Sequence, residues 1–344
     1  MKTNKKIIER KILENKIKRI DQALDNLASM DSDCSLCPRE CHVNRQKGEL
    51  GFCKIRNRAT VSHVLRHYGE EPVLSGYFDC SKNQSAKSRK QSGSGTIFFT
   101  GCNLKCLYCQ NYQLSWLNQG QPYSDSELAQ MMLNLQRNGA LNINLVSPTH
   151  VILPILRALK IAYDQGLELP VVYNSNGFEK KEVLENLEGI IDIYLPDLKY
   201  FSSQTSSKFS DAPDYFQYAS QALIEMQGQQ PQLILNNKEI ALKGLIIRHL
   251  ILPGQKNDAF AILNWIAQSL SLSVPLSLMS QYYPCYKAPP EIQKTITQEE
   301  YQEVLSKAED IGFEYMFIQP EPFESNEHLL PDFSLPHPFP WDTP

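Results

Sequence analysis

Three cysteines stand close together in the segment Gly101-Cys102-Asn103-Leu104-Lys105-Cys106-Leu107-Tyr108-Cys109-Gln110-Asn111. The segment directly follows an apolar run at residues 96–100 that is typical of a strand, so three thiolates project from one short loop at the strand's end. Structural zinc sites and iron–sulfur clusters normally have four protein ligands, and no fourth cysteine follows nearby. A three-thiolate loop can hold a 4Fe-4S cluster with one iron left open, and an open iron can take a ligand that does chemistry.

This spacing, with Tyr108 before the last cysteine, resembles the signature loop of the radical S-adenosylmethionine (SAM) enzymes. The resemblance implies that Cys102, Cys106 and Cys109 hold a catalytic 4Fe-4S cluster whose open iron binds SAM. It also implies that one-electron reduction splits SAM to methionine and a 5′-deoxyadenosyl radical. Two other interpretations stay open: a C-x2-C pair of the redox or zinc type, and three buried, inert cysteines.

The composition fits an intracellular enzyme. With 344 residues and 42% apolar content, the chain is long enough for one large α/β domain with an appendage. Nine cysteines in clusters argue against a disulfide framework and favour metal or redox chemistry. A net charge of −4 gives no electrostatic footprint for duplex nucleic acid. We expect a cytoplasmic protein.

Residues 1–30 predict an amphipathic helix, because apolar side chains recur every three or four positions. The segment lacks the continuous apolar run of a signal peptide, and no later run is long enough to span a bilayer. Packing against the protein's own domain is the simplest interpretation, and a helix on a membrane surface is the alternative.

A second group of cysteines lies within residues 31–78, which we interpret as a metal-binding module. Gly48 and Gly51 permit tight backbone turns around the ligands. Four thiolates suit zinc and an iron–sulfur cluster equally well, so the metal stays open. The alternative is four reduced thiols without a metal. The candidate ligands are Cys34, Cys37, Cys41 and Cys53.

The run from residue 34 to residue 53 resembles the N-terminal module of radical SAM proteins described as pyruvate formate-lyase-activating-enzyme-like. Segments 95–99, 109–112, 142–150 and 192–200 extend the resemblance, which covers residues 34 to about 320. The resemblance implies an activating-enzyme-like oxidoreductase.

The chain departs from this pattern at residues 79–95, a Ser-, Lys- and Gly-rich insertion that we expect to be flexible. Cys80 within it is interpreted as a bystander.

Strand-like and helical segments alternate after the cysteine loop, which predicts crossover connections and a parallel sheet. The expected strands are 143–146, 170–173, 190–194, 245–252, 275–279 and 315–318. The expected helices are 125–138, 151–165, 179–187, 213–227, 257–270 and 297–310. The family resemblance narrows this α/β fold to a partial (β/α)6-type barrel over residues 96–319. The Pro-rich tail, 320–344, is expected to wrap the barrel as extended chain.

Candidate SAM contacts follow the strands, because sites in parallel barrels form at the carboxyl ends of strands. After the second strand, Ser147, Thr149 and His150 stand where most radical SAM enzymes carry Gly-Gly-Glu-Pro. After the third, Asn174, Ser175 and Asn176 resemble the Asp-Thr-Asn turn of glycyl-radical activases, whose polar groups can bind a ribose. Each set has a plainer interpretation, as a loop cap or a polar turn.

Charged residues mark the next two strands. Asp197 and Lys199 occupy the activases' Asp-x-Lys pattern, and Lys199 is expected to pair with the carboxylate of SAM. Arg248 lies in an apolar strand and requires a partner for its charge, either that carboxylate or a protein Asp or Glu. Cys285, near the end of the following strand, has no assigned role.

The sequence thus favours a radical SAM enzyme that uses a 4Fe-4S cluster and SAM, with an electron donor such as a flavodoxin or a ferredoxin. The resemblance suggests a glycyl residue of a partner enzyme as hydrogen donor. A peptide, an RNA or a metabolite is the alternative substrate. From another class, a non-catalytic iron–sulfur or zinc protein for electron transfer or binding stays open.

Overall fold

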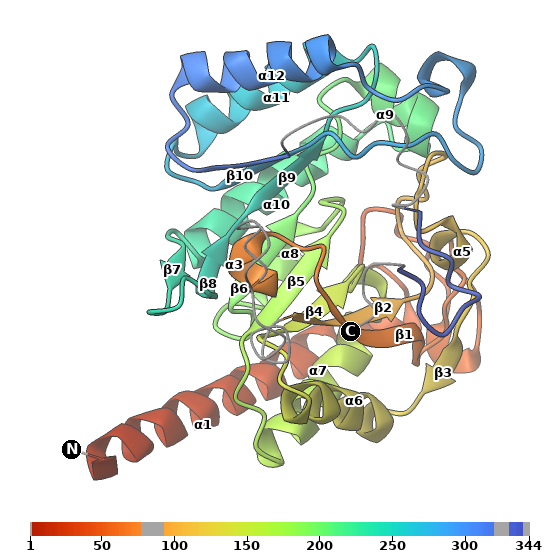
Figure 1. Ribbon diagram of the computed structural model, residues 1–344. Coiled ribbons are helices and arrows are strands. Elements are labelled where there is room, and N and C mark those ends of the chain that lie inside the picture. Colours follow the sequence, from red (N-terminus) through yellow and green to blue (C-terminus); the bar gives the residue numbers. More distant parts are fainter. Residues whose placement is uncertain (1, 77–92, 320–329, 340–344) are drawn as a thin grey trace.

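Parallel strands alternating with helices build the body of the molecule (Figure 1). The computed structural model describes residues 2–76, 93–319 and 330–339, with side chains from residue 11 onward. The strands are β1 (Ala59–His67), β2 (Ser94–Phe99), β3 (Gln121–Tyr123), β4 (Ile143–Val146), β5 (Val171–Ser175), β6 (Ile193–Pro196), β7 (Ile234–Leu235), β8 (Ala241–Leu245), β9 (Ile247–Leu250), β10 (Leu276–Met279) and β11 (Met316–Ile318). 

The helices cover this sheet and connect its strands. The longer ones are α1 (Lys2–Leu27), α6 (Asp125–Arg137), α7 (Ile152–Asp164), α9 (Ser203–Ser210), α10 (Tyr215–Gln229), α11 (Lys256–Ser269) and α12 (Gln298–Ile311). The short ones are α2 (Ser29–Ser32), α3 (Pro72–Ser75), α5 (Tyr112–Ser115) and α8 (Lys181–Glu185), with 3-10 turns at Arg45–Lys47, Thr149–Val151 and Pro290–Ile292. In Figure 1, α11 and α12 lie at the top of the sheet, and α6 and α7 at the bottom.

The sheet follows the chain order through its parallel part. Strands β2, β4, β5 and β6 pair parallel in sequence, and β9, β10 and β11 form a second parallel set. A bridge between Asp197 and Arg248 joins the end of β6 to β9. This succession of parallel strands confirms the predicted α/β fold, and it brings the carboxyl ends of β2, β4, β5 and β6 together at one edge.

Two parts of the sheet differ from the sequence prediction. Residues 59–67, assigned to the cysteine-rich module, form β1, which pairs antiparallel with β2 and extends the main sheet. The predicted strand at 245–252 is divided between β8, which pairs with β6, and β9, which pairs with β10. Leu245 is the last residue of β8, whereas Ile247–Leu250 form β9. Hydrophobicity alone does not show where one strand ends and the next begins.

The predicted insertion and tail are only partly described. Residues 77–92, including Cys80, lie outside the described residues, whereas Ser94 and Gly95 begin β2. Of the tail, residues 330–339 are described without regular secondary structure. Phe333 and Phe339 pack there against Phe98 of β2, with ring centroids 5.3 and 5.6 Å from it.

Helix α1 packs on the body of the protein through its second half. Ile20, Ala23 and Leu27 are buried, and α1 contacts α7. Lys16 of α1 also donates to Asp192, the residue before β6, at 2.6 Å. Ile12 is 56% exposed. No helix among the described residues combines the length and apolarity needed to span a bilayer.

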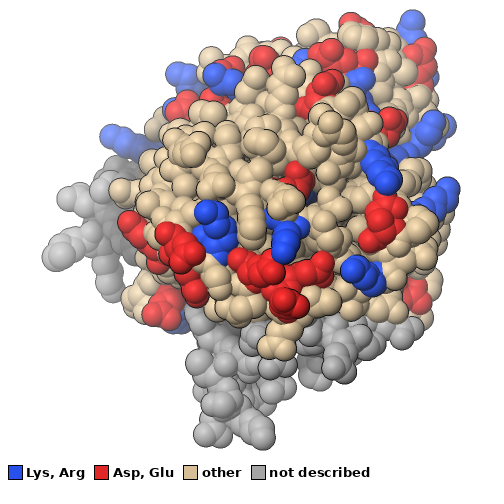
Figure 2. Space-filling view, turned by 90° about the horizontal axis from the view of Figure 1, so that it is seen from above, with Lys and Arg blue, Asp and Glu red and all other residues tan. Residues whose placement is uncertain are grey.

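Charged side chains of both signs are interspersed on the face seen in Figure 2. That face therefore carries no broad basic patch of the kind that binds the phosphate backbone of a duplex.

Substitution Ile20→Ala tests the packing of α1. We expect it to lower the free energy of unfolding by about 2–5 kcal/mol, because it opens a cavity between α1 and α7. The exposed Ile12→Ala is the matched control and should change it by less than about 0.5 kcal/mol. Thermal and urea unfolding followed by circular dichroism measure both, and equal effects would contradict the packing.

Candidate functional site

The three-cysteine loop directly follows β2 and is held from several sides. Its backbone takes the left-handed conformation at Gly101 (φ 79°) and at Lys105 (φ 56°), which allows the sharp turns. The Leu107 N–H donates to the carbonyl of Phe209 at 2.9 Å, and the Trp116 indole N–H donates to the carbonyl of Cys106 at 3.0 Å. The loop is thus a fixed platform between α9 and α5.

Hydrogen-bond donors point at the sulfur atoms of this loop. Cys102 Sγ accepts from the Leu104 backbone N–H at 3.3 Å and from Asn176 Nδ2 at 3.4 Å. Cys109 Sγ accepts from the hydroxyl of Ser115 at 3.2 Å. Donors of this kind stabilise thiolates and tune iron–sulfur clusters.

A partly buried ion pair lies beside the same thiols. Lys199 Nζ is 2.6 Å from a carboxylate oxygen of Asp197. Burial lowers the pKa of Lys199, but the charges of Asp197 and Cys106 outweigh this and raise it, so Lys199 stays protonated. Burial raises the pKa of Cys106, and the charge of Lys199 opposes that rise. The cation therefore favours thiolates at this loop.

These features fit a 4Fe-4S cluster held by Cys102, Cys106 and Cys109. The chemistry of the donor set agrees: three thiols on one rigid loop, N–H and O–H groups donating to sulfur, and an adjacent cation. Among the residues that the structure describes, no three Cys, His, Asp or Glu side chains are already arranged to hold a single metal ion.

Tyr108 and the turn after β5 support this loop. The Tyr108 hydroxyl is buried and hydrogen-bonded to that of Tyr200 at 2.7 Å. Asn176 is held by Asn103 Oδ1 as well as by Cys102, and Ser175 Oγ accepts from the Gly177 N–H. The structure thus places Tyr108, Ser175 and Asn176 in hydrogen bonds within the protein.

The side chains near the ends of β4 and β5 differ in whether they have hydrogen-bond partners. Thr149 Oγ1 donates to Glu179 at 2.5 Å, and His150 Nε2 donates to the carbonyl of Thr100 at 2.7 Å. The side chains of Ser147 and Asn174 form no hydrogen bond within the part of the chain that the structure describes. They are adjacent, since the Ser147 N–H donates to the Asn174 carbonyl at 2.9 Å. These two side chains remain available to a ligand.

Arg248 has protein partners for its charge. Its Nε donates to Glu71 at 2.8 Å, and its Nη2 bonds to both Glu70 and Glu71. Of the two partners that the sequence left open, the structure thus supplies the protein carboxylates. Glu71 is buried, and the side chains of Arg248 and Glu70 are only 13% and 7% exposed, so this group ties the segment before α3 to β9.

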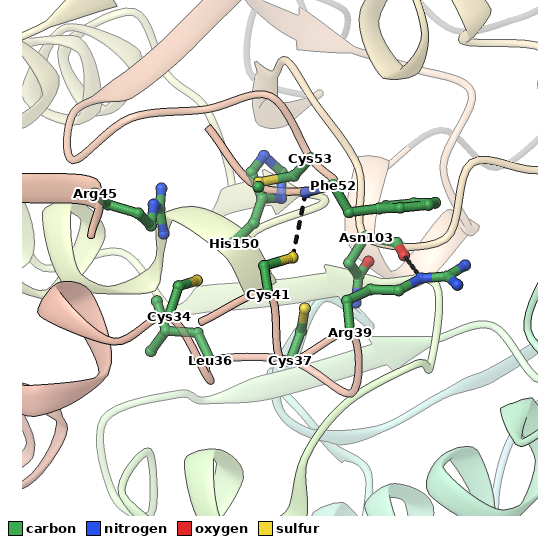
Figure 3. A pocket seen from close by; sticks show the side chains of 11 residues that line it. Cys34, Leu36, Cys37, Arg39, Cys41, Arg45, Phe52, Cys53, Asn103 and His150 are labelled. Atoms are coloured by element: carbon green, nitrogen blue, oxygen red, sulfur yellow. Dashed lines mark hydrogen bonds between the residues drawn. The ribbon is translucent and has the colours of Figure 1, made fainter. Parts of the chain in front are cut away.

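The N-terminal cysteines surround one small cavity that reaches the catalytic loop (Figure 3). His150 and Asn103 also line this cavity. A side chain at Gly101 would clash here, because a Cβ atom would lie 2.6 Å from the carbonyl oxygen of Cys53. The cysteine-rich module and the C-x3-C-x2-C loop are therefore in direct contact.

Arg39 joins these two parts. Its guanidinium donates to carbonyls of the loop, at Asn103 (2.9 Å) and Leu104 (3.3 Å), and of the end of α9, at Ser210 (3.0 Å) and Asp211 (2.6 Å). Sequence reasoning did not single out Arg39, although it stands between two candidate metal ligands in Cys37-Pro38-Arg39-Glu40-Cys41.

Glu179 was also missed. It is fully buried and accepts from Thr149 and from Tyr173, whose hydroxyl is 3.2 Å away. Burial raises its pKa to about 7, although these donors oppose the rise. The sequence feature that could have identified Glu179 is its position just after the turn at Asn174 to Gly177.

Substitution Arg248→Met tests the buried ion group. We expect a loss of about 3–5 kcal/mol in the free energy of unfolding, because Glu70 and Glu71 would stay buried without their counter-charge. Lys181→Met, which removes an exposed pair with Glu185, should cost about 0.5 kcal/mol or less. Chemical denaturation of both variants measures these losses. A loss for Arg248→Met as small as that for Lys181→Met would contradict the prediction and show that the carboxylates find other partners.

Glu179→Gln tests the buried carboxyl. A carboxyl whose pKa rises from about 4.5 to about 7 on folding binds more protons folded than unfolded, so its contribution to stability falls as pH rises between these values. The neutral amide removes that loss, and we expect the variant to gain melting temperature relative to wild type from pH 5 to pH 8. A pH series of melting curves measures this; parallel wild-type and variant curves would contradict it.

Comparisons with known proteins bear on this site. The family model described as "Radical SAM superfamily" matches residues 96–224. The uncharacterized protein MJ0674 of Methanocaldococcus jannaschii is 30% identical over 310 residues, which cover 87% of this chain and 80% of the relative. The uncharacterized protein MJ0808 of the same organism is 24% identical over 309 residues, 86% of this chain and 83% of the relative.

Solved structures give more distant matches. Streptococcus suis SuiB bound to precursor peptide SuiA has a TM-score of 0.45 and 14% identity, over 63% of this chain and 46% of that one. Methylornithine synthase has a TM-score of 0.41 and 12% identity, over 65% of this chain and 70% of that one. This chain thus spans less than half the length of the SuiB chain. The residues matched by the family model include the three-cysteine loop and strands β4, β5 and β6, and the chain belongs to the radical SAM superfamily.

Proposed function

We propose that this protein cleaves SAM reductively with a 4Fe-4S cluster bound by Cys102, Cys106 and Cys109, and abstracts hydrogen from a glycyl residue of a partner enzyme. The observation that carries the proposal is the rigid loop after β2, where sulfur-directed hydrogen bonds and the charge of Lys199 surround three thiols.

When bound, the cluster and SAM supply a one-electron reductive cleavage that yields a 5′-deoxyadenosyl radical. The chain's own residues bind, orient and exclude water. Asn176 and Ser115 donate to the ligand sulfurs, while Tyr108 and Tyr200 brace the loop from its buried side. Lys199, kept protonated by Asp197, offers a cation for the carboxylate of SAM.

Further SAM contacts are proposed at the carboxyl ends of β4 and β5. The free side chains of Ser147 and Asn174 are suited to hydrogen-bond the amino group or the ribose of SAM. The backbone at Ser147 takes φ 58°, which is uncommon for a residue with a side chain and is typical of ligand-binding turns.

Two turns near the three-cysteine loop support one class of substrate. Asn174 to Gly177 and Asp197-x-Lys199 resemble the corresponding turns of glycyl-radical activases, which supports a protein glycyl residue as hydrogen donor. The electron donor is a small one-electron protein such as a flavodoxin or a ferredoxin.

Formation of 5′-deoxyadenosine tests the reaction. The protein is reconstituted anaerobically with iron and sulfide, and then given dithionite or reduced flavodoxin together with SAM. We expect 5′-deoxyadenosine from wild type and none above the enzyme-free level from the Cys102→Ala/Cys106→Ala/Cys109→Ala variant, which lacks the cluster ligands. Liquid chromatography with mass spectrometry quantifies the product.

Cys285→Ala is the matched control, because Cys285 is a neighbouring thiol that is not a proposed cluster ligand and whose Sγ donates to the Tyr108 carbonyl at 3.4 Å. It should retain iron and product formation. A wild-type protein that carries the cluster and binds SAM but yields no 5′-deoxyadenosine with either reductant would overturn the proposal and favour electron transfer or binding. Incubation with a deuterated candidate partner then assigns the substrate, since deuterium enters 5′-deoxyadenosine only from the true donor.

A further inference from the structure

The cavity of the N-terminal module is built by a tightly turned backbone. The N–H of Cys34 donates to the Val43 carbonyl, and the N–H of His42 donates back to the Cys34 carbonyl, both at 3.0 Å. Cys41 Sγ accepts from the Phe52 N–H at 3.2 Å. A Cβ atom at Gly51 would lie 2.9 Å from that sulfur, so only glycine permits this approach. Two loops thus bring four thiols to a cavity of about 10 Å³, room for roughly one water-sized sphere.

Arg45 brings an unbalanced positive charge into the wall of this cavity. It is 2% exposed, and its Nη2 donates to the Arg56 carbonyl while its Nε has no hydrogen-bond partner. Among the described residues no Asp or Glu forms an ion pair with it, and a titratable neighbour in the cavity wall is the thiol of Cys34. A buried charge without a counter-charge is strongly destabilising.

The cysteines do not supply the missing charge as free thiols. A free thiol is neutral, whereas a thiolate that ligates a metal is negatively charged. Metal binding displaces their protons, and four thiolates around a divalent ion or a cluster leave a net negative charge. A bound metal would therefore provide the counter-charge that Arg45 lacks.

His150 presents a second unpartnered atom in the same wall. Because the Thr100 carbonyl accepts from Nε2, that nitrogen carries the hydrogen, and burial lowers the pKa of His150 to about 4, which keeps the ring neutral. Nδ1 then bears a lone pair, and it has no partner although His150 is 2% exposed. Imidazoles at metal sites commonly donate their other N–H to a backbone carbonyl in this way.

We propose that Cys34, Cys37, Cys41 and Cys53 bind a second metal centre, a zinc ion or an iron–sulfur cluster, with Arg45 as its buried counter-ion and His150 in its wall. The thiols are not yet at the distances of a single-ion site, so binding draws them together. Through Thr100, His150 connects this centre to the start of the loop that carries Cys102. The proposal is independent of the proposed reaction, because it concerns metal content rather than turnover.

The test uses the full-length Cys102→Ala/Cys106→Ala/Cys109→Ala variant, purified anaerobically with and without reconstitution by iron and sulfide. We expect either about one zinc per chain or about four iron and four sulfide per chain, which distinguishes the two forms of the centre. Elemental analysis and the visible absorption spectrum read out the result. Additional Cys34→Ala and Cys37→Ala substitutions should remove this metal. A folded triple variant that binds neither metal would overturn the proposal.

The role of Arg45 is tested in the same background by Arg45→Met. We expect metal affinity, measured by competition with a chromophoric chelator, to fall about tenfold or more. Lys47→Met removes an exposed cation two residues away and is the matched control, which should keep the affinity. Arg45→Lys restores the charge and should recover binding if Arg45→Met alone folds poorly. Unchanged affinity in a folded Arg45→Met variant would overturn the counter-ion assignment.

Discussion

The guanidinium group of Arg39 is the contact on which the arrangement of the site depends. It donates to four backbone carbonyls, two in the three-cysteine loop and two at the end of α9, and it lies 4.0 Å from the centroid of the Phe52 ring. Buried carbonyls require partners, and a planar cation with several N–H groups can serve carbonyls from two segments at once. One side chain of the N-terminal module thus fixes the catalytic loop and the helix that supports it.

Cations lie beside both cysteine groups, the N-terminal one and the C-x3-C-x2-C loop. Lys199 lies near Cys106 and Cys109, Arg45 near Cys34 and Cys53, and Lys105 near Cys102 and Cys53. Neutral thiols would gain nothing from such neighbours, and burying the cations would only be costly. Thiolates bound to a metal, as we propose for both groups, would carry the negative charge that makes this arrangement stable. In both groups, the nearby cations would balance the charge of metal-bound thiolates, although one group has three cysteines and the other has four.

The sequence predicted the parts of this fold that depend on local pattern. Strand β4 occupies the predicted residues 143–146, because a short apolar run between a turn and a helix has few other interpretations. The partner of Arg248 was beyond such reasoning, since Glu70 and Glu71 lie 178 and 177 residues away along the chain. His150 was expected at the SAM side of the loop, a role that stays a prediction. Its ring packs beside the N-terminal cysteines, a direction set by the turn after β4 rather than by residue type.

The close approach at Gly101 explains why the two cysteine groups behave as one structural unit. The carbonyl oxygen of Cys53 lies 2.6 Å from the position that a Cβ atom at Gly101 would take, and the residue after Gly101 is the first cysteine of the C-x3-C-x2-C loop. Any shift of Cys53, such as the closing of four thiols around a metal, therefore acts directly on the backbone next to Cys102. Because packed interiors do not deform freely, such a shift passes to the loop through Gly101 and Arg39 together. The module thus braces the three-cysteine loop through contacts with its backbone.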